Sequence, residues 1–330
     1  MSLTTPLATF VRIRDYDAQY AQDVHDEAYF GFPVAGILEA ERVLRDPRAR
    51  PIAYFSMEYG LATNTYNVFQ SHRPDQPANK LSENDIISND RISDYLFSLK
   101  IDALLDLPIY SGGLGVLAGD TIKTAADHKL PLVAIGILWN KGYFRQRFWF
   151  KFGQLPEEMN WDPPTFPGLV PLEDKVKIEL KDRDIWLRLW KYYVFNHRRD
   201  YAVPLILLDS NVPENDEASR RLTDRLYRSD DLDARLLQRL VLGMGGIKAL
   251  EALGYPIDLH HLNEGHAAFA FVQKARGVLP ADQKSLVEDF VYTCHTPVPA
   301  GHDRFNLADV ERLMRFDDVA TVKQYGLEND

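Results

Sequence analysis

Short apolar runs alternate with helix-like sequence along most of this chain, and this alternation limits the folds that it can adopt. The runs predicted to be strands are Ile52 to Ser56, Leu132 to Trp139, Val176 to Leu180, Ile185 to Trp190, Ala202 to Asp209, Asp258 to His261 and Phe290 to His295. The sequence between several of them has the spacing of an amphipathic helix. Such alternation favours a mostly parallel sheet covered on both faces. We therefore expect a doubly wound α/β fold that binds ligands at the carboxyl ends of its strands.

The order of these segments predicts one large domain after a helical lead-in. Residues 1 to 50 are helix-like and include the apolar run Val34 to Val43. Residues 51 to 330 hold all the predicted strands, and no repeat or low-complexity tract interrupts them. A chain of this length can bury a sizeable core without disulfides.

Charge and cysteine content exclude several classes of protein. The formal net charge of −10 disfavours binding to nucleic acid or to anionic lipid. The single cysteine, Cys294, cannot form an internal disulfide or a multi-cysteine metal site, so we expect a reducing, cytoplasmic location. The sequence has no apolar stretch of the roughly 18 residues that a membrane span needs, and its N-terminus lacks a secretory signal pattern.

A glycine-rich turn between Leu107 and Leu130 is the first candidate for a binding site. Gly112, Gly113 and Gly115 follow an apolar run and precede helix-compatible sequence. Glycines let the backbone turn tightly and bring N–H groups onto one ligand, and a helix N-terminus adds partial positive charge. This pattern predicts a cradle for an anion such as phosphate, with close packing as the alternative explanation. A second glycine cluster, residues 243 to 246, lies within a predicted helix from Asp231 to Leu253 and is interpreted as a packing feature.

Two further polar loops follow predicted strands. The first contains His261, Asn263, Glu264 and His266 before an apolar helix. A zinc site is disfavoured because Gly265 interrupts the helical spacing that such a site needs, whereas simple helix capping by Asn263 remains an alternative. No metal is therefore predicted.

The second polar loop follows the strand that starts at Phe290. It carries His295, Thr296, His302 and Asp303. Because carboxyl ends of neighbouring parallel strands meet at one edge, we expect the glycine turn and both polar loops to line one crevice. Alternating aromatic residues from Phe144 to Phe152, in contrast, predict a strand in the sheet core rather than a sugar platform.

Five segments in order carry a resemblance to a known family. They read YFSMEYGL, IYSGGLGVLAGD, GYFRQRF, HLNEGHAAF and TCHTPVPAGHD, and together they span roughly residues 50 to 310. In this order they resemble the N-terminal half of bacterial short-type α-glucan (glycogen or maltodextrin) phosphorylases. The resemblance implies a Rossmann-like N-terminal half of a glycosyltransferase-B fold.

The family resemblance also implies a reaction and a cofactor. Inorganic phosphate would attack the terminal α-1,4-linked glucose of a glucan and release glucose 1-phosphate with retention of configuration, assisted by the phosphate of pyridoxal phosphate. Gly112 and Gly113 would present backbone N–H groups to phosphate. Glu58 would lie near the cofactor end of the cleft.

The same resemblance assigns the sugar site. His295 would contact the glucose 6-hydroxyl through its side chain and the reacting carbon through its carbonyl. The remaining residues implied to line or position the sugar cleft are Leu114, Asn263, Glu264, His266 and Thr296. Cys294 differs from the asparagine of longer relatives, and Tyr59-Gly60 differs from the animal and plant pattern after Glu58.

The chain ends where the resemblance would continue into a second, cofactor-bearing domain. Because the attachment lysine of pyridoxal phosphate belongs to that domain, it is absent from this chain, and we expect the isolated chain to be inactive. The implied partners are an α-glucan, inorganic phosphate and the missing C-terminal domain, and a homo-oligomer stays open.

Two other functions remain open from the sequence. Half of a nucleotide-sugar glycosyltransferase of the glycogen synthase type would share the SGGLG turn, but Tyr110 stands where such an enzyme usually carries lysine. A non-catalytic glucan-binding module is the second alternative, favoured by the short chain.

Overall fold

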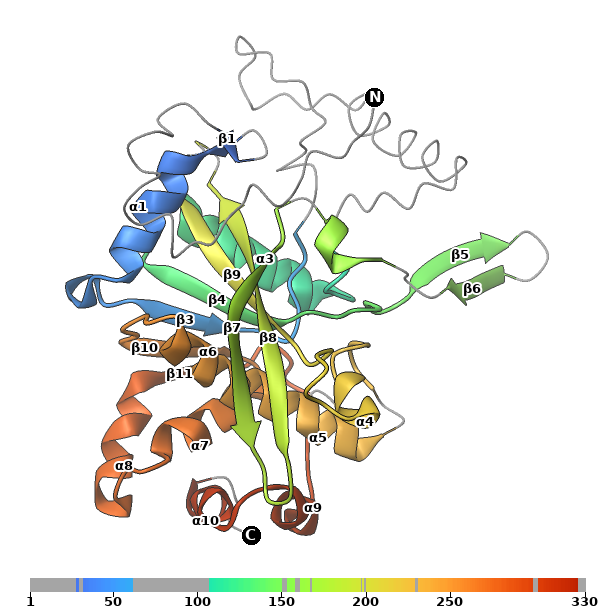
Figure 1. The fold of residues 1–330 in the computed structure, drawn as a ribbon, viewed down its shortest axis with the longest axis vertical. Helices are drawn as coiled ribbons and strands as arrows, with labels where there is room; N and C mark the ends of the chain where they lie inside the picture. The colour runs from blue at the N-terminus through green and yellow to red at the C-terminus, as the bar shows by residue number, and fades with distance from the viewer. Residues whose placement is uncertain are drawn as a thin grey trace.

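A seven-stranded sheet forms the centre of the protein in the computed structural model (Figure 1). Its strands lie in the order β11 (Phe290–Thr293), β10 (Leu259–Asn263), β3 (Ile52–Phe55), β4 (Leu132–Ile137), β9 (Ala202–Asp209), β8 (Asp184–Phe195) and β7 (Val170–Glu179). The structure describes residues 28–29, 32–61, 107–149, 153–157, 161–166, 168–196, 198, 200–228, 231–298 and 302–325.

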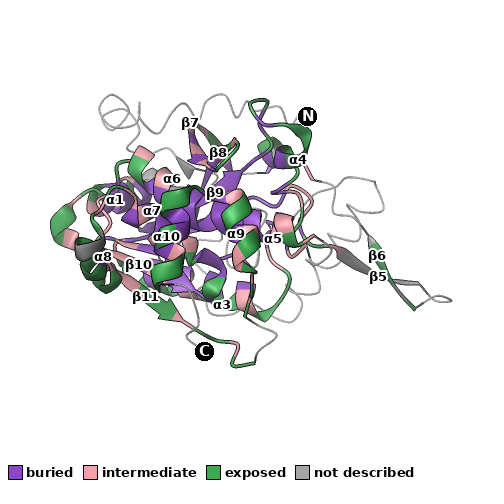
Figure 2. Cartoon of the chain, turned by 90° about the horizontal axis from the view of Figure 1, so that it is seen from below, coloured by how far each residue is buried: buried purple, intermediate pink, exposed green. Residues whose placement is uncertain are grey.

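The sheet is mostly parallel, as the alternation of strands and helices predicts. The five strands from β11 to β9 pair in parallel, whereas β8 and β7 are antiparallel. Every residue of β4 and β9 is buried, which explains why both read as continuous apolar runs in the sequence. The arrangement confirms an α/β fold and is consistent with a Rossmann-like architecture. Strand β11 at one edge carries exposed residues (Figure 2).

Helices cover both faces of the sheet (Figure 1). Helices α1 (Val34–Leu44) and α3 (Gly113–Asp127) lie on one face. The other face is covered by a continuous helix that joins α5 (Leu232–Leu240), the π-helical turn η6 (Val241–Gly245) and α6 (Gly246–Ala252), and by α7 (Phe269–Ala275). Since β3 leads to α3 and β10 leads to α7, the chain switches faces between these two adjacent strands, where ligands bind in open α/β sheets.

The glycine cluster of η6 and α6 serves close packing, as predicted. A Cβ atom on Gly243 would lie 2.5 Å from the backbone nitrogen of Ala270 on α7. A Cβ atom on Gly246 would lie 2.5 Å from the Phe55 ring on β3. These glycines therefore let the long helix approach both the sheet and α7, and they leave no room for a dinucleotide.

The prediction that the aromatic segment after Tyr143 belongs to the sheet core is wrong. It forms β5 (Arg145–Trp149), which pairs in the described structure with β6 (Gly153–Glu157) as a separate two-stranded sheet. This hairpin projects from the body of the protein (Figure 1). Alternation of side chains indicates a strand correctly, but it does not specify the sheet that the strand joins.

The remaining elements are short. They are β1 (Ala28–Tyr29), β2 (Phe32–Pro33), η3 (Pro47–Ala49), η5 (Pro163–Thr165), α4 (Glu217–Arg220), η7 (Gly265–Ala267), α8 (Pro280–Leu286), η8 (Val287–Asp289), α9 (Leu307–Leu313) and α10 (Phe316–Tyr325). No helix in the described ranges combines the length and the apolar character that crossing a membrane requires.

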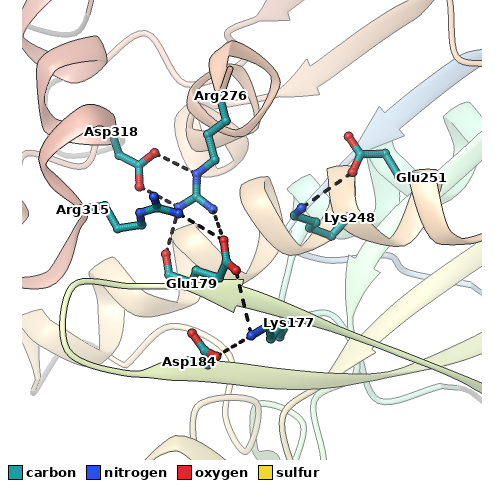
Figure 3. A network of polar contacts seen from close by, with 8 residues as sticks. All are labelled: Lys177, Glu179, Asp184, Lys248, Glu251, Arg276, Arg315 and Asp318. Atoms are coloured by element: carbon teal, nitrogen blue, oxygen red, sulfur yellow. Dashed lines mark hydrogen bonds and ion pairs between the residues drawn. The ribbon is translucent and has the colours of Figure 1, made fainter. Parts of the chain in front are cut away.

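A charged cluster fastens α10 to the body of the protein (Figure 3). Arg276, which follows α7, donates two hydrogen bonds to Asp318 of α10, at 2.8 and 2.6 Å, and one to the carbonyl of Glu179 on β7. Arg315 donates to the carboxylate of the same Glu179. These residues line a polar cavity of about 470 Å³ that shares no lining residue with the glycine turn or the histidine loops. The cluster explains how the last helix is held.

The Arg276–Asp318 pair is expected to be important for stability. The Asp318 side chain is only 2% exposed, so Asp318→Asn leaves Arg276 without its buried counter-charge and should lower the free energy of unfolding by about 3 kcal/mol. Asp317→Asn on the same helix changes an exposed carboxylate and should cost less than about 0.5 kcal/mol. Urea unfolding followed by circular dichroism measures both; equal effects would contradict this role.

Candidate functional site

The glycine turn is held by a buried carboxylate from the neighbouring strand loop. Glu58, just after β3, is 3% exposed. Its Oε2 accepts hydrogen bonds from the backbone N–H of Ser111 at 2.6 Å and of Gly112 at 3.4 Å. The amide of Gly112, predicted to bind phosphate, therefore already faces an internal anion. Glu58 comes to the turn itself, consistent with its expected place beside a phosphate site.

The glycines of the turn divide into two groups. A Cβ atom on Gly115 would lie 2.9 Å from the Glu58 carboxylate, and one on Gly119 would lie 1.9 Å from the carbonyl oxygen of Gly60. These two glycines let α3 approach the loop after β3. In contrast, Cβ atoms on Gly112 and Gly113 would meet no atom of the described residues within 4 Å. The turn thus has an open side at its two leading glycines.

That open side carries backbone donors at the start of α3. Gly112 is the N-cap residue and Gly113 begins the helix. Among the described residues, none accepts a hydrogen bond from the N–H groups of Gly113 and Leu114. The first N–H groups of a helix have no partner within the helix and attract anions. Gly113 and Leu114 therefore offer the free amides of the turn.

Tyr227 joins the glycine turn to the first histidine loop. Its hydroxyl donates to Glu58 Oε1 at 2.6 Å, and its ring centroid lies 5.9 Å from that of His266. Tyr227 has a left-handed backbone with φ of 56°. Burial, reinforced by the Glu58 charge, raises the pKa of Tyr227 well above its ordinary value, so the hydroxyl stays a donor. The sequence reasoning missed Tyr227, which has no local motif around it.

His266 is buried among charged side chains of both signs, the positive Arg239 and Arg235 and the negative Asp303 and Glu264. Burial first, and then the Arg239 guanidinium, lower the pKa of His266 to about 4. Its Nδ1 atom is buried and has no partner among the described groups. At neutral pH the ring is therefore uncharged, with one nitrogen as donor and the other as acceptor.

Two arginines of α5 form ion pairs with Asp303, near the C-terminal end of the second polar loop. Arg239, 3% exposed, donates from Nε to Asp303 Oδ2 at 2.6 Å, and Arg235 pairs with the other oxygen. Although burial opposes it, the charge of Arg239 keeps the pKa of Asp303 below its ordinary value. Sequence reasoning noted Asp303 in the loop but missed both arginines, because a helix alone does not show which loop it faces.

Glu264 forms hydrogen bonds with the N-terminal end of the same loop. This buried residue has a left-handed backbone with φ of 64°. Its Oε1 accepts hydrogen bonds from the backbone N–H of His295 at 2.8 Å and from the hydroxyl of Thr296 at 3.0 Å. The strained backbone turns the carboxylate toward the next strand, where it orients the loop that carries both residues.

Asn263 connects the loops after β10 and β3. Its side chain is fully buried, and Nδ2 donates to the Ser56 hydroxyl at 3.1 Å. Ser56 in turn donates to the carbonyl of Glu58 at 2.8 Å. The alternative that Asn263 caps the following helix is wrong, because Asn263 is the last residue of β10 and its side chain crosses to β3.

The predicted residues therefore gather around adjacent strand ends. Side-chain hydrogen bonds connect the loops after β3, β10 and β11, and the glycine turn joins them through Glu58. His295 is exposed, and its neighbour Cys294 is an exposed free thiol 4.0 Å from His302. In the ranges that the structure describes, no cluster of three or more His, Cys, Asp and Glu side chains could hold a metal ion.

Comparison with known proteins gives these loops a family context. No protein-family model matches the chain. It is 42% identical to the maltodextrin phosphorylase of Thermococcus litoralis over 224 residues, which are 64% of this chain and 26% of that protein. It is 38% identical to the glycogen phosphorylase of Mycobacterium tuberculosis over an alignment of 244 residues, which covers 66% of this chain and 26% of that protein. The matched part of this chain is homologous to α-glucan phosphorylases.

A more distant relative supports the same conclusion. The chain is 30% identical to the glycogen phosphorylase of Aquifex aeolicus over 224 residues, which are 64% of the chain and 31% of that protein. The homologous segment thus spans about a quarter to a third of the phosphorylases that it matches. These matches are consistent with the chain being a fragment of a phosphorylase.

The buried histidines predict a pH dependence of stability. Burial lowers the pKa of His260 to about 4, as it does for His266. Both values lie below the ordinary 6.5, so the unfolded chain binds more protons between pH 6.5 and 4. The free energy of unfolding should therefore fall as pH drops through this window, by about 1.4 kcal/mol per pH unit for each histidine.

Urea titrations between pH 7 and 4 measure this loss, and histidine NMR gives the two midpoints. His266→Gln should reduce the slope by the share of one histidine, about 1.4 kcal/mol per pH unit. A midpoint near 6.5 for His266 in the folded protein would contradict its buried environment.

Proposed function

We propose that this chain provides one wall of an α-glucan phosphorylase active site. The observation that carries the proposal is the connection of the glycine turn and two histidine loops at adjacent strand ends, in a segment homologous to phosphorylases. The reaction is the phosphorolysis of a terminal α-1,4-linked glucose to glucose 1-phosphate, with retention of configuration.

The chemistry of the loops suits this pair of ligands. The free amides of Gly113 and Leu114, with the turn at Gly112, suit an oxyanion, because fixed backbone dipoles stabilise charge without reorganisation. His266 is uncharged at neutral pH and suits sugar hydroxyls, which both donate and accept hydrogen bonds. His295 and Thr296 complete the sugar side, oriented by Glu264.

We propose that the enzyme uses pyridoxal phosphate as its cofactor. The glycine turn fits a phosphate group, since Gly112 and Gly113 leave the space of a side chain open. We propose that the lysine that attaches pyridoxal phosphate belongs to the second domain of the enzyme and not to this wall. When bound between two complete walls, its phosphate would supply proton transfer to the reacting phosphate.

The second wall is proposed to be a further Rossmann-like domain, which would make the whole a glycosyltransferase-B enzyme. We propose that both walls are needed to form glucose 1-phosphate. The glycan, inorganic phosphate and this second domain are the proposed partners, in the cytoplasm.

A chimeric enzyme tests the proposed function. The matched segment of the T. litoralis maltodextrin phosphorylase is replaced by that of this chain, and release of glucose 1-phosphate from maltodextrin is measured. We expect activity, and we expect His266→Ala or His295→Ala to lower kcat about 100-fold, as loss of a positioned hydrogen-bond donor does.

His302→Ala is the matched control, because this exposed histidine of the same loop contacts only the Cys294 thiol among described groups. Its kcat should stay within about twofold of the chimera, since it removes no contact to sugar or phosphate. A folded chimera without activity, or equal effects of all three alanines, would refute the assignment.

A further inference from the structure

The Glu58 carboxylate occupies the position of an internal ligand within the glycine turn. Its Oε2 accepts from the Ser111 and Gly112 amides and lies 3.3 Å from the Ser111 hydroxyl, while Oε1 accepts from Tyr227. Three of these contacts are to Oε2 and one is to Oε1, so both oxygens of the carboxylate accept hydrogen bonds from the protein. Glu58 is also 3% exposed, so these contacts are shielded from solvent.

This engagement has a structural and an electrostatic consequence. The short bond to Ser111 fixes the turn before any ligand arrives, because a charge-assisted hydrogen bond is strong and directional. The same carboxylate places a permanent negative charge behind the amides of Gly113 and Leu114. An oxyanion at these amides would therefore bind next to a like charge.

Tyr227 fixes the orientation of this carboxylate from 169 positions away in the sequence. It comes from the irregular segment before α5 and is packed beside His266. The other charged groups around it are Arg239 and Asp303, which interact with Tyr227 electrostatically and with each other directly. The Tyr227 hydroxyl is the partner that the described structure gives to Glu58 Oε1.

We propose that Tyr227 and Glu58 are positioning residues that preset the glycine turn, and that the Glu58 charge limits how tightly the turn holds an oxyanion. The proposal rests on the proposed function for the identity of the oxyanion, which is inorganic phosphate. It adds Tyr227, which would act through Glu58, to the residues that position the site.

Two substitutions separate the two roles. Glu58→Gln keeps an acceptor for the Ser111 and Gly112 amides, and its new NH2 group can donate to the Tyr227 oxygen, so the turn stays in place without the charge. Tyr227→Phe keeps the charge but leaves the buried Oε1 atom without its donor. The matched control is Tyr201→Phe, which removes a hydroxyl that donates to the Leu130 carbonyl at the other end of α3.

The first measurement needs no ligand. Spectra of the chain labelled with ¹⁵N in glycine and serine report the Ser111 and Gly112 amides directly. Tyr227→Phe is expected to shift both signals although Tyr227 does not touch them, and Glu58→Gln is expected to move the Ser111 proton upfield as the charge-assisted bond weakens. Tyr201→Phe should leave both unchanged. Unchanged signals in Tyr227→Phe would overturn the positioning role.

The second measurement is calorimetric titration of each variant with inorganic phosphate. Glu58→Gln is expected to tighten binding about tenfold, because a like charge beside the ligand is removed, whereas Tyr227→Phe weakens it about fivefold. Opposite changes in phosphate affinity in the two variants are the decisive result, since merely structural roles would weaken phosphate binding in both variants. Equal losses, or no phosphate binding even in Glu58→Gln, would overturn the role of the charge. Absence of binding with the expected amide shifts would refute the phosphate site of the proposed function while leaving the positioning role in place.

Discussion

The hydrogen bond between the Glu58 carboxylate and the Ser111 amide is the contact around which the site is arranged. It joins the loop after β3 to the start of α3, and Gly115 and Gly119 permit the close approach that the bond requires. Through its other oxygen, Glu58 also reaches Tyr227 and the neighbourhood of His266. A turn, a strand loop and a segment before α5 thus share one buried negative charge.

A second carboxylate, that of Glu264 after β10, likewise binds the backbone of a neighbouring loop, the one after β11. Glu264 binds the backbone of His295 and the hydroxyl of Thr296, while Asp303 of the same loop pairs with two arginines of α5. The loop that carries His295 is therefore fixed at both ends. Because β3 and β10 lie where the chain switches from one face of the sheet to the other, these fixed loops border the crevice that α/β sheets use for ligands.

Local patterns predicted the scaffold well, and they predicted long-range polar contacts poorly. The bounds of β9, Ala202–Asp209, match the predicted strand because an entirely buried strand is a continuous apolar run. The packing role of Gly243 and Gly246 also followed from the helical period around them. However, Glu58 and Ser111 are 53 positions apart, and no periodicity indicates that one side chain binds the other amide.

The same limit explains the misplaced elements of the site. Asn263 has the composition of a helix cap, yet its side chain crosses to Ser56, a contact 207 positions away. Tyr227 and Arg239 carry no motif, and only the packing of α5 and of the segment before it brings them to the site. The family resemblance located the histidines and glycines, but it did not reveal that a protein carboxylate already occupies part of the glycine turn.

The most direct test of this account is a crystal structure of the chain soaked with inorganic phosphate. We expect phosphate on the amides of Gly113 and Leu114, with Glu58 still hydrogen-bonded to Ser111 and Tyr227. Phosphate bound instead in the charged cavity beside α10, or a Glu58 side chain turned away from the Ser111 amide, would contradict it.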